Sequence, residues 1–163
     1  SIIMKIRIGL GVDTHKLVKN RNLMLGGIHI PSALGCQGHS DADVLIHAIC
    51  DALLGAVNLR DIGYHFPDTD NEYKDIDSKI LLTKTHQLIQ SKGWKIINID
   101  STIVIEQPKL SPYIALMKES LANVLKLEIE DISIKAKTSE KLGFIGREEG
   151  VSAYAVVLVE KQA

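Results

Sequence analysis

The chain has 163 residues, of which 45% are hydrophobic and 24% are charged, and its formal net charge at pH 7 is −1. This length suffices for one domain with a sizeable core, and the balanced charge argues against a surface for nucleic acid. The sequence has no run long enough to span a membrane and no signal-peptide pattern. Cys36 and Cys50 form no C-x-x-C motif, which favours a reducing compartment. We expect a single domain over residues 1–163, in which residues 1–3, before Met4, are an expression remnant or the end of a trimmed leader.

The first half of the chain predicts a strand, a hairpin and a helix. Apolar and charged side chains alternate over 4–12, as in a strand. Apolar arms surround Gly26-Gly27, which is typical of a β-hairpin. The pattern then favours a helix at about 41–57, with Ser40 as its cap and Asp43 in the capping-box position. An Asp-rich loop follows over 61–77.

The second half predicts two further helices and three strands. Helical segments are expected at about 77–91 and from Ser111-Pro112 to about 126. Strands are expected at 94–106, 132–138 and 151–161, with a loop or short helix at 139–150. Strands at both ends with helices between them predict an α/β or α+β domain.

The last predicted strand is apolar on both faces, which suits a strand that is covered on both sides. One face carries Val151, Ala153, Ala155, Val157 and Val159, and the other carries Tyr154, Val156 and Leu158. Three helices can cover only one face of a small sheet. We therefore expect a second copy of the chain on the other face; the alternative is that the Gly-rich loops fold over it.

Three residues form a candidate metal site. Asp13 and His15, in GVDTHKL, lie on one face if this stretch is a strand; the alternative is a polar turn after the strand. His47 lies on a helix that is apolar almost all round, between Asp43 and Asp51 at i−4 and i+4. Such a stripe indicates a metal ligand with orienting groups, although a lone buried histidine is often a hydrogen-bonded core residue. Asp13, His15 and His47 would leave a fourth tetrahedral position open, as catalytic zinc sites do.

Four further stretches are candidates for ligand contacts. His39 precedes the predicted helix start, where backbone N–H groups attract anions; it could equally be an exposed histidine. The stretch DIGYHFPDTD is either a shaped substrate loop or a solvated acidic or calcium-binding loop. EQPKLSP could be an ordinary strand-to-helix loop. The glycines of KTSEKLGFIGREEG allow close backbone approach to a ligand.

In chain order the sequence carries D-x-H, H-S-D-A-D…H-A…D-A-L-L-G, D-I-G…F-P-D-T-D, P-K-L and S-E-K-L-G-F-x-G-R. This series closely resembles the 2-C-methyl-D-erythritol 2,4-cyclodiphosphate synthase family of the non-mevalonate isoprenoid pathway, over nearly the whole chain. The resemblance implies an α/β (α+β) fold with a mixed four-stranded sheet and helices on one face. It also implies a homotrimer whose sheets pack around a threefold axis, with active sites at the subunit interfaces.

The resemblance further implies roles for individual residues. Zinc would be held by Asp13, His15 and His47, and a second ion, Mg²⁺ or Mn²⁺, by Glu140. His39 and Thr138 would be catalytic, and residues 105–111 would receive the cytosine from the neighbouring subunit. The implied substrate contacts are Ser40, Asp61, Ile62, Gly63, Phe66, Pro67, Asp68, Thr69, Asp70, Ile105, Glu106, Gln107, Pro108, Lys109, Leu110, Ser111, Lys137, Ser139, Phe144 and Arg147.

The implied activity is that of a cyclising phosphorus–oxygen lyase. The 2-phosphate of 4-diphosphocytidyl-2-C-methyl-D-erythritol 2-phosphate attacks the β-phosphorus, and CMP leaves. We expect a cytoplasmic or plastid-stromal protein with no nucleic-acid or membrane partner. Departures from the family pattern occur at Val12, Ala42, Glu106, Lys137 and Ser139, and the last three leave the nucleotide and diphosphate contacts open.

Two other functions remain open from the residues alone. A zinc-dependent phosphohydrolase would use the same three ligands to activate water. A non-catalytic metal-stabilised assembly would close the fourth position with a protein group, for which Cys36 is the candidate.

Overall fold

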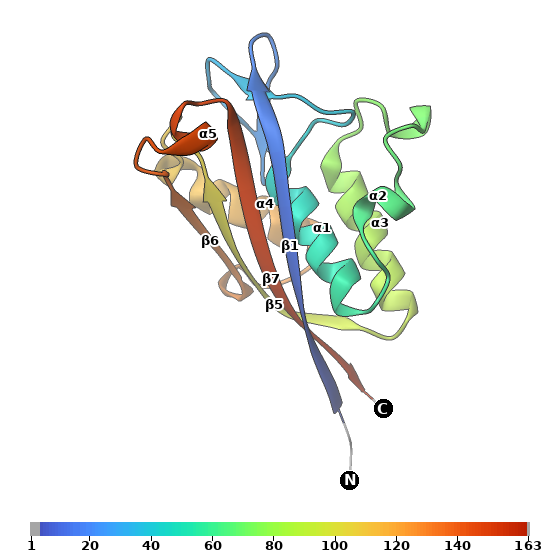
Figure 1. Cartoon of the computed structure of the whole chain (residues 1–163). Coiled ribbons are helices and arrows are strands. Elements are labelled where there is room, and N and C mark those ends of the chain that lie inside the picture. Colours follow the sequence, from blue (N-terminus) through green and yellow to red (C-terminus); the bar gives the residue numbers. More distant parts are fainter. Residues whose placement is uncertain (1–3, 163) are drawn as a thin grey trace.

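The structure is a computed structural model that describes residues 4–162. The remnant or leader suggested for residues 1–3 lies outside the described residues. The first half contains β1 (Met4–Val18), β2 (Leu23–Leu25), β3 (Ile28–Ile30), β4 (Gly35–Cys36), α1 (Val44–Ala56), α2 (Ile62–His65) and the 3₁₀ turn η1 (Asn71–Tyr73). The second half contains α3 (Ser78–Ser91), β5 (Lys95–Val104), η2 (Ser111–Tyr113), α4 (Ile114–Leu125), η3 (Ile129–Asp131), β6 (Ile132–Lys137), α5 (Gly143–Gly146) and β7 (Gly150–Gln162) (Figure 1).

The main sheet is mixed, as expected, but within residues 4–162 it has five strands rather than four. Its order is β4-β1-β7-β5-β6, and the β2–β3 hairpin forms a separate small sheet. β7 is antiparallel to both β1 and β5, whereas β5 and β6 are parallel. The additional strand is β4, whose two residues pair with the end of β1. Such a short strand is not visible in a sequence pattern that needs several alternating residues.

The two faces of strand β1 carry very different residues. A Cβ atom added to Gly9 would lie 1.9 Å from Ala52 O, and one added to Gly11 would lie 1.8 Å from Ala48 O. Only glycine therefore allows α1 to pack directly against the strand. Because side chains alternate along a strand, the other odd-numbered residues of β1, including Asp13 and His15, face the α1 side.

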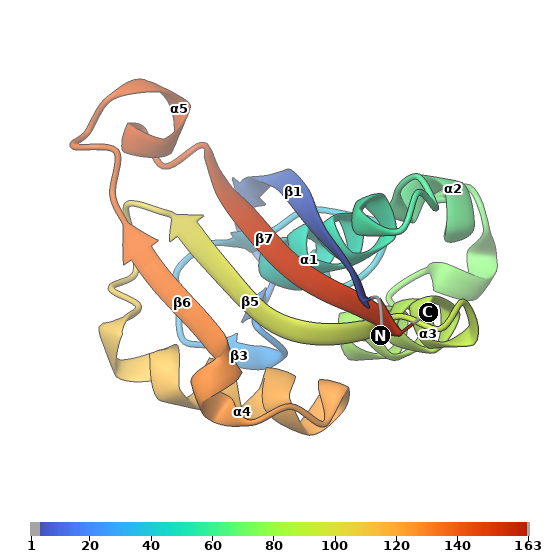
Figure 2. The same cartoon turned by 90° about the horizontal axis from the view of Figure 1, so that it is seen from below.

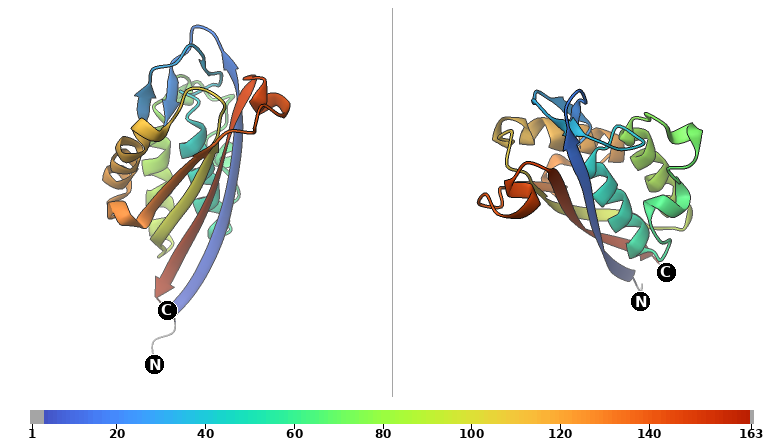
Figure 3. Two further views of the ribbon diagram at one scale, coloured as in Figure 1. Left: turned by 90° about the vertical axis from the view of Figure 1, so that its left-hand side faces the viewer. Right: turned by 45° about the horizontal axis from the view of Figure 1, so that its top comes forward.

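The long helices α1, α3 and α4 lie on one face of the sheet, and Figure 2 shows this layer together with the smaller α5 loop beyond the opposite face. The opposite face remains open in a single chain. Six of its large apolar side chains are between 44% and 74% exposed, namely Ile6, Ile8, Leu10, Val12, Tyr154 and Val156. The alternative that the Gly-rich loops cover this face is therefore wrong. Figure 3 shows the loop around α5 projecting from one end of the long β1–β7 pair.

The start of α1 differs from the sequence-based expectation. The helix begins at Val44, and its N-cap is Asp43, whose carboxylate accepts a hydrogen bond from Ile46 N. Ala42 has φ +59°, so a helix that begins at residue 41 and is capped by Ser40 cannot pass through it. The Asp43 carboxylate also accepts hydrogen bonds from Gly26 N and Gly27 N, and so joins the β2–β3 hairpin to the helix start.

The remaining elements follow the predictions closely. The helix α3 has Asp77 as its N-cap, and the third predicted helix begins with the 3₁₀ turn η2, which contains Pro112, before α4. The loop predicted over 61–77 contains the two short helical turns α2 and η1. Among the described residues, no helix combines the length and hydrophobicity needed to cross a bilayer.

Candidate metal centre and ligand clefts

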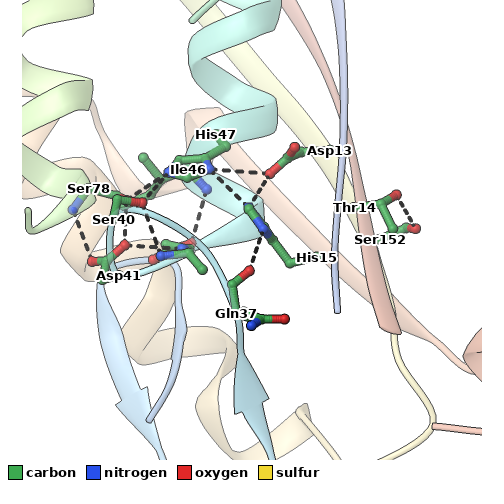
Figure 4. Close-up of polar contacts among 12 residues, drawn as sticks. Asp13, Thr14, His15, Gln37, Ser40, Asp41, Ile46, His47, Ser78 and Ser152 are labelled. Atoms are coloured by element: carbon green, nitrogen blue, oxygen red, sulfur yellow. Dashed lines mark hydrogen bonds and ion pairs between the residues drawn. The ribbon is translucent and has the colours of Figure 1, made fainter. Parts of the chain in front are cut away.

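Asp13, His15 and His47 come together between β1 and α1. Asp13 Oδ2 lies 2.8 Å from His15 Nε2 and 3.3 Å from His47 Nδ1, and these two ring nitrogens are 3.2 Å apart (Figure 4). The strand β1 runs through both Asp13 and His15, so the alternative of a polar turn at this place is wrong. One turn of α1 supplies the third side chain, and Gly9 and Gly11 allow that helix to lie close enough.

The far sides of both imidazole rings have polar partners. His15 Nδ1 lies 3.1 Å from the carbonyl oxygen of Gln37 and donates to it. His47 Nε2 lies 2.9 Å from Ser78 Oγ and 3.2 Å from Ser40 Oγ. His47 is thus hydrogen-bonded in the core, but this contact uses only one ring nitrogen, and the other still faces Asp13 and His15.

The charges of this cluster are strongly coupled. Burial by itself would raise the pKa of Asp13, but the close contacts with His15 and His47 and their positive charges lower it to about 2. Burial opposes protonation of His47, yet its contact with Asp13 and the charges of Asp13, Asp43 and Asp41 raise the pKa of its imidazole. The cluster therefore attracts positive charge.

These residues fit a transition-metal ion such as zinc. Their three ligand atoms lie within 4.8 Å of one another. Asp13 Oδ2 is buried, and no donor approaches it with hydrogen-bond geometry, despite the two nearby ring nitrogens. Two imidazole nitrogens and one carboxylate oxygen are ligands that zinc accepts. Cys36 does not belong to the cluster, and its pKa is raised to about 12, first of all by burial, which disfavours the thiolate that binds metals.

The orienting groups differ from those expected from the sequence. Asp43 is the N-cap of α1, and Asp51 accepts a hydrogen bond of 2.7 Å from Ile62 N, which holds the start of α2. The residues that contact His47 beyond the cluster are instead Ser40 and Ser78. Sequence reasoning missed Ser78, because a serine at the start of a helix is read as part of a helix terminus.

A cleft of about 580 Å³ opens beside the metal cluster. Three of its lining residues, Gly38, Tyr73 and Leu81, were not predicted from the sequence. The others are predicted site residues, namely His15, His39, Ser40, His47, Ile62, Gly63, Phe66, Pro67, Asp68 and Thr69. Tyr73 and Leu81 were missed because an aromatic or apolar residue that lines a cleft cannot be distinguished, from sequence, from one in the core.

Two of the predicted acidic residues, Asp61 and Asp70, are not among the residues that line this cleft. Asp61 directly precedes α2 as its N-cap residue. The Asp70 carboxylate accepts a hydrogen bond from Glu72 N at 2.9 Å, and the Asp70 carbonyl accepts one of 2.9 Å from His39 Nε2. His39 is thus oriented by the acidic loop rather than free in solvent.

A second cleft, of about 410 Å³, lies at the ends of β5 and β6. It is lined by Ala136 and by the predicted residues Ile105, Glu106, Gln107, Pro108, Lys109, Leu110, Ser111, Lys137 and Thr138. No residue lines both this cleft and the metal-side cleft. A single chain therefore does not bring the two groups of predicted substrate residues together.

Glu106 has a partner within the chain. Its Oε1 accepts hydrogen bonds from Ser139 N at 2.7 Å and Ser139 Oγ at 3.1 Å. The carboxylate thus connects the loop after β5 to the loop after β6. In this second loop, Glu140 has φ +56° and its backbone N–H donates to Thr138 Oγ1.

The last three predicted residues lie outside both clefts. The Glu140 carboxylate is not part of the three-residue metal cluster among the described residues. Phe144 is exposed and packs beside Gly150, near the carbonyl oxygen of His15. Arg147 pairs with Glu149 on the surface.

Comparisons with known proteins point to one family. The YgbB family matches residues 6–160. A protein of Bacteroides thetaiotaomicron named 2-C-methyl-D-erythritol 2,4-cyclodiphosphate synthase is 64% identical over 158 residues, which are 97% of this chain and 99% of that protein. A protein of Parabacteroides distasonis with the same name is also 64% identical, over 97% of this chain and 98% of that one.

Solved structures agree with this similarity. A 2C-methyl-D-erythritol-2,4-cyclodiphosphate synthase in a CDP-bound form is 38% identical with a TM-score of 0.87, over 94% of this chain and 99% of that chain. The bifunctional IspDF of Campylobacter jejuni is 40% identical with a TM-score of 0.94 over 98% of this chain, which spans 43% of that longer protein.

Proposed function

The chain belongs to the YgbB family, and we propose that it is a 2-C-methyl-D-erythritol 2,4-cyclodiphosphate synthase, a cyclising phosphorus–oxygen lyase of isoprenoid biosynthesis. The substrate is 4-diphosphocytidyl-2-C-methyl-D-erythritol 2-phosphate, and the products are the cyclic diphosphate and CMP. The observation that carries this proposal is the three-ligand cluster of Asp13, His15 and His47, with an open cleft beside it. The bacterial relatives support a cytoplasmic location.

The proposed reaction needs positioning more than proton transfer. An oxygen of the 2-phosphate forms a bond to the β-phosphorus, and the bond between the β-phosphorus and the CMP oxygen breaks, with its electron pair leaving on CMP. The nucleophile is already an anion, so holding it in line and neutralising charge accounts for most of the rate enhancement. Such a reaction needs no Ser-His or Cys-His nucleophile pair of the hydrolase type, and the histidine that Ser40 contacts in the metal-side cleft, His47, is a proposed metal ligand.

The chain's own residues supply the positioning. A zinc ion held by Asp13, His15 and His47 would act as a Lewis acid on the reacting phosphates. His39 and Ser40 line the same cleft, where the Ser40 hydroxyl can donate to a phosphate oxygen, and residues 66–70, of which 66–69 line the cleft, would enclose the methylerythritol portion. Thr138 and Lys137, at the second cleft, can hold the diphosphate.

The same proposal includes a homotrimer. The metal-side cleft and the 105–111 cleft are separate in one chain, although the substrate must contact both. The exposed apolar face of β1 and β7 offers the surface through which copies can associate. In such an assembly the 105–111 loop of one chain would receive the cytosine of a substrate that is bound at the metal centre of its neighbour. A solved relative in a CDP-bound form supports a cytidine nucleotide as ligand.

A second divalent ion, Mg²⁺ or Mn²⁺, completes the proposed site. Hard cations of this kind bind carboxylate and phosphate oxygens together. Glu140 would hold the ion against the substrate diphosphate, because its loop directly follows the Thr138 and Lys137 positions.

Incubation with the cytidylyl substrate in ¹⁸O-water, followed by phosphorus NMR, tests the reaction. We expect CMP and the cyclic diphosphate in equal amounts, with no oxygen taken from water. Inorganic phosphate or ¹⁸O in the phosphorylated product would instead identify a zinc-dependent phosphohydrolase. Absence of any turnover with zinc bound and the trimer formed would favour a non-catalytic metal-stabilised assembly. Glu140→Gln should lower turnover while zinc content stays near that of the unaltered protein.

A further inference from the structure

The buried side of His47 leads to a short chain of polar side chains. Ser78 is fully buried, and its Oγ lies 2.9 Å from His47 Nε2. On its other side, Ser78 Oγ donates to Asp41 Oδ1, while Ser78 N donates to Asp41 Oδ2 at 2.9 Å. Figure 4 shows Asp41, Ser78 and His47 in this order, leading to Asp13. Residues 41 and 78 belong to the segments that immediately precede α1 and begin α3.

The donors and acceptors along this chain allow one arrangement for a neutral His47. An ionised carboxylate only accepts hydrogen bonds, so the Asp41–Ser78 contact uses the single hydroxyl proton of Ser78. Ser78 Oγ can then offer only a lone pair to His47 Nε2. The proton of the neutral imidazole must therefore lie on Nε2, which leaves a lone pair on Nδ1. That is the nitrogen that lies 3.3 Å from Asp13 Oδ2 and 3.2 Å from His15 Nε2.

We propose that Asp41 and Ser78 are positioning residues that hold His47 in the tautomer and orientation needed for Nδ1 to bind the metal ion. The backbone helps to hold the carboxylate in place, because Asp41 Oδ1 also accepts a hydrogen bond from Asp43 N at 3.1 Å. Polar groups behind a metal ligand generally fix its orientation in this way. The inference rests on the metal centre of the proposed function and is independent of the reaction that the centre catalyses.

The same arrangement determines what Ser40 can do. Its Oγ accepts a hydrogen bond from Ala42 N at 3.1 Å and lies 3.2 Å from His47 Nε2, which carries a proton. Neither contact uses the hydroxyl proton of Ser40. Ser40 lines the metal-side cleft, so this proton is available to an anionic ligand there.

The direct test is the affinity of the purified protein for Zn²⁺ alone, measured by competition with a chromophoric chelator in the absence of substrate. Ser78→Ala should weaken zinc binding by about tenfold or more, the usual effect of losing such a partner. Ser101→Ala is the matched control. Like Ser78, Ser101 is a buried serine whose hydroxyl donates a hydrogen bond, in its case to the carbonyl oxygen of Ser133. This control should leave zinc affinity unchanged, and Ser78→Thr, which keeps the hydroxyl, should restore most of it.

Asp41→Asn gives a second, nearly isosteric variant for the case in which Ser78→Ala folds poorly. The NH₂ group of the amide replaces one acceptor, so the contact with Asp43 N or the one with Ser78 N is lost. From the Oδ1 position this group donates to Ser78 Oγ, which frees the Ser78 hydroxyl to donate to His47 Nε2 and favours the Nδ1–H tautomer. Long-range ¹H–¹⁵N NMR of the metal-free protein reads this tautomer directly, and we expect a shift of the proton from Nε2 towards Nδ1.

Two results would overturn the inference: zinc affinity of Ser78→Ala and Asp41→Asn equal to that of the unaltered protein, or a neutral His47 with its proton on Nδ1 before any change. Both measurements are made without substrate. They therefore remain decisive even if the proposed cyclisation is disproved.

Discussion

The two clefts of this chain differ in how complete they are. The metal-side cleft has its ligands on β1 and α1, with most of their polar partners supplied by the same chain. The 105–111 cleft is built from loops at the ends of β5 and β6, and residues 140 and 141 beside it have positive φ values. The first depends on close packing of regular elements, whereas the second depends on loop contacts. The metal-ligand cluster thus lies within one chain, whereas the proposed substrate site would need the 105–111 cleft of another copy.

Removal of one metal ligand should have the largest effect. His47→Ala leaves two ligands, so we expect metal content to fall from about one zinc ion per chain to nearly none, with loss of activity. Atomic absorption measures the metal, and circular dichroism checks that the fold remains. His29→Ala, at an exposed position in β3, is the control and should keep its zinc. Full zinc occupancy in His47→Ala would contradict the assignment.

A charge on the open sheet face should prevent copies of the chain from associating without disturbing the metal centre. Leu10→Glu places a carboxylate on this face, where burial against another chain would leave it unpaired. We expect light scattering to report monomers and activity to be lost, while each chain still binds zinc. Leu116→Glu, at a similarly exposed leucine on α4, should keep both assembly and activity. An active monomer of Leu10→Glu would show that one chain carries a complete site.

The affinity for zinc should rise with pH, because zinc and protons compete for His47. The contact with Asp13 and the nearby negative charges raise the pKa of His47, so in the metal-free protein zinc must displace a proton from this imidazole at the acidic end of the range. Each proton that zinc displaces from a ligand adds up to about tenfold in affinity per pH unit, so affinity should rise with pH until the imidazole ligands are neutral, and then level off. Asp13, with a pKa of about 2, stays ionised over this range and adds no slope. Chelator competition between pH 5.5 and 8 measures the slope; a flat profile would contradict the coupling of His47 to the metal.

The smallest effect is expected at the second cleft. Glu106→Gln keeps one acceptor for Ser139 N but removes the charge, which should weaken this contact by about 1 kcal/mol. We expect kcat/KM to fall about fivefold through the Thr138 loop, with zinc content unchanged. Glu119→Gln on the surface of α4 is the control. A loss of zinc in Glu106→Gln would mean that the two clefts are coupled within one chain.

Much of the fold and the metal cluster could be predicted from the sequence because their signals are local. The alternation of side chains along β1 placed Asp13 and His15 on one face, and the helical period placed His47 on a buried helix. The resemblance of the motifs to one family added the candidate substrate residues, and the family itself is confirmed by the comparisons. Their roles in binding and catalysis remain predictions.

Other features were decided by contacts between segments that are distant in sequence. Local capping rules favoured Ser40, but the left-handed Ala42 delays the helix, and Asp43 becomes the cap because its carboxylate also serves the hairpin at Gly26 and Gly27. Ser78 and Asp41 are 37 residues apart, and Glu106 and Ser139 are 33 apart. A residue's own neighbours in sequence carry no record of such partners, because a side-chain hydrogen bond depends on where folding brings the second segment. The sequence by itself therefore determined which elements form and which side chains can bind a metal, and only the tertiary structure decided which groups orient those side chains and which sheet face stays open.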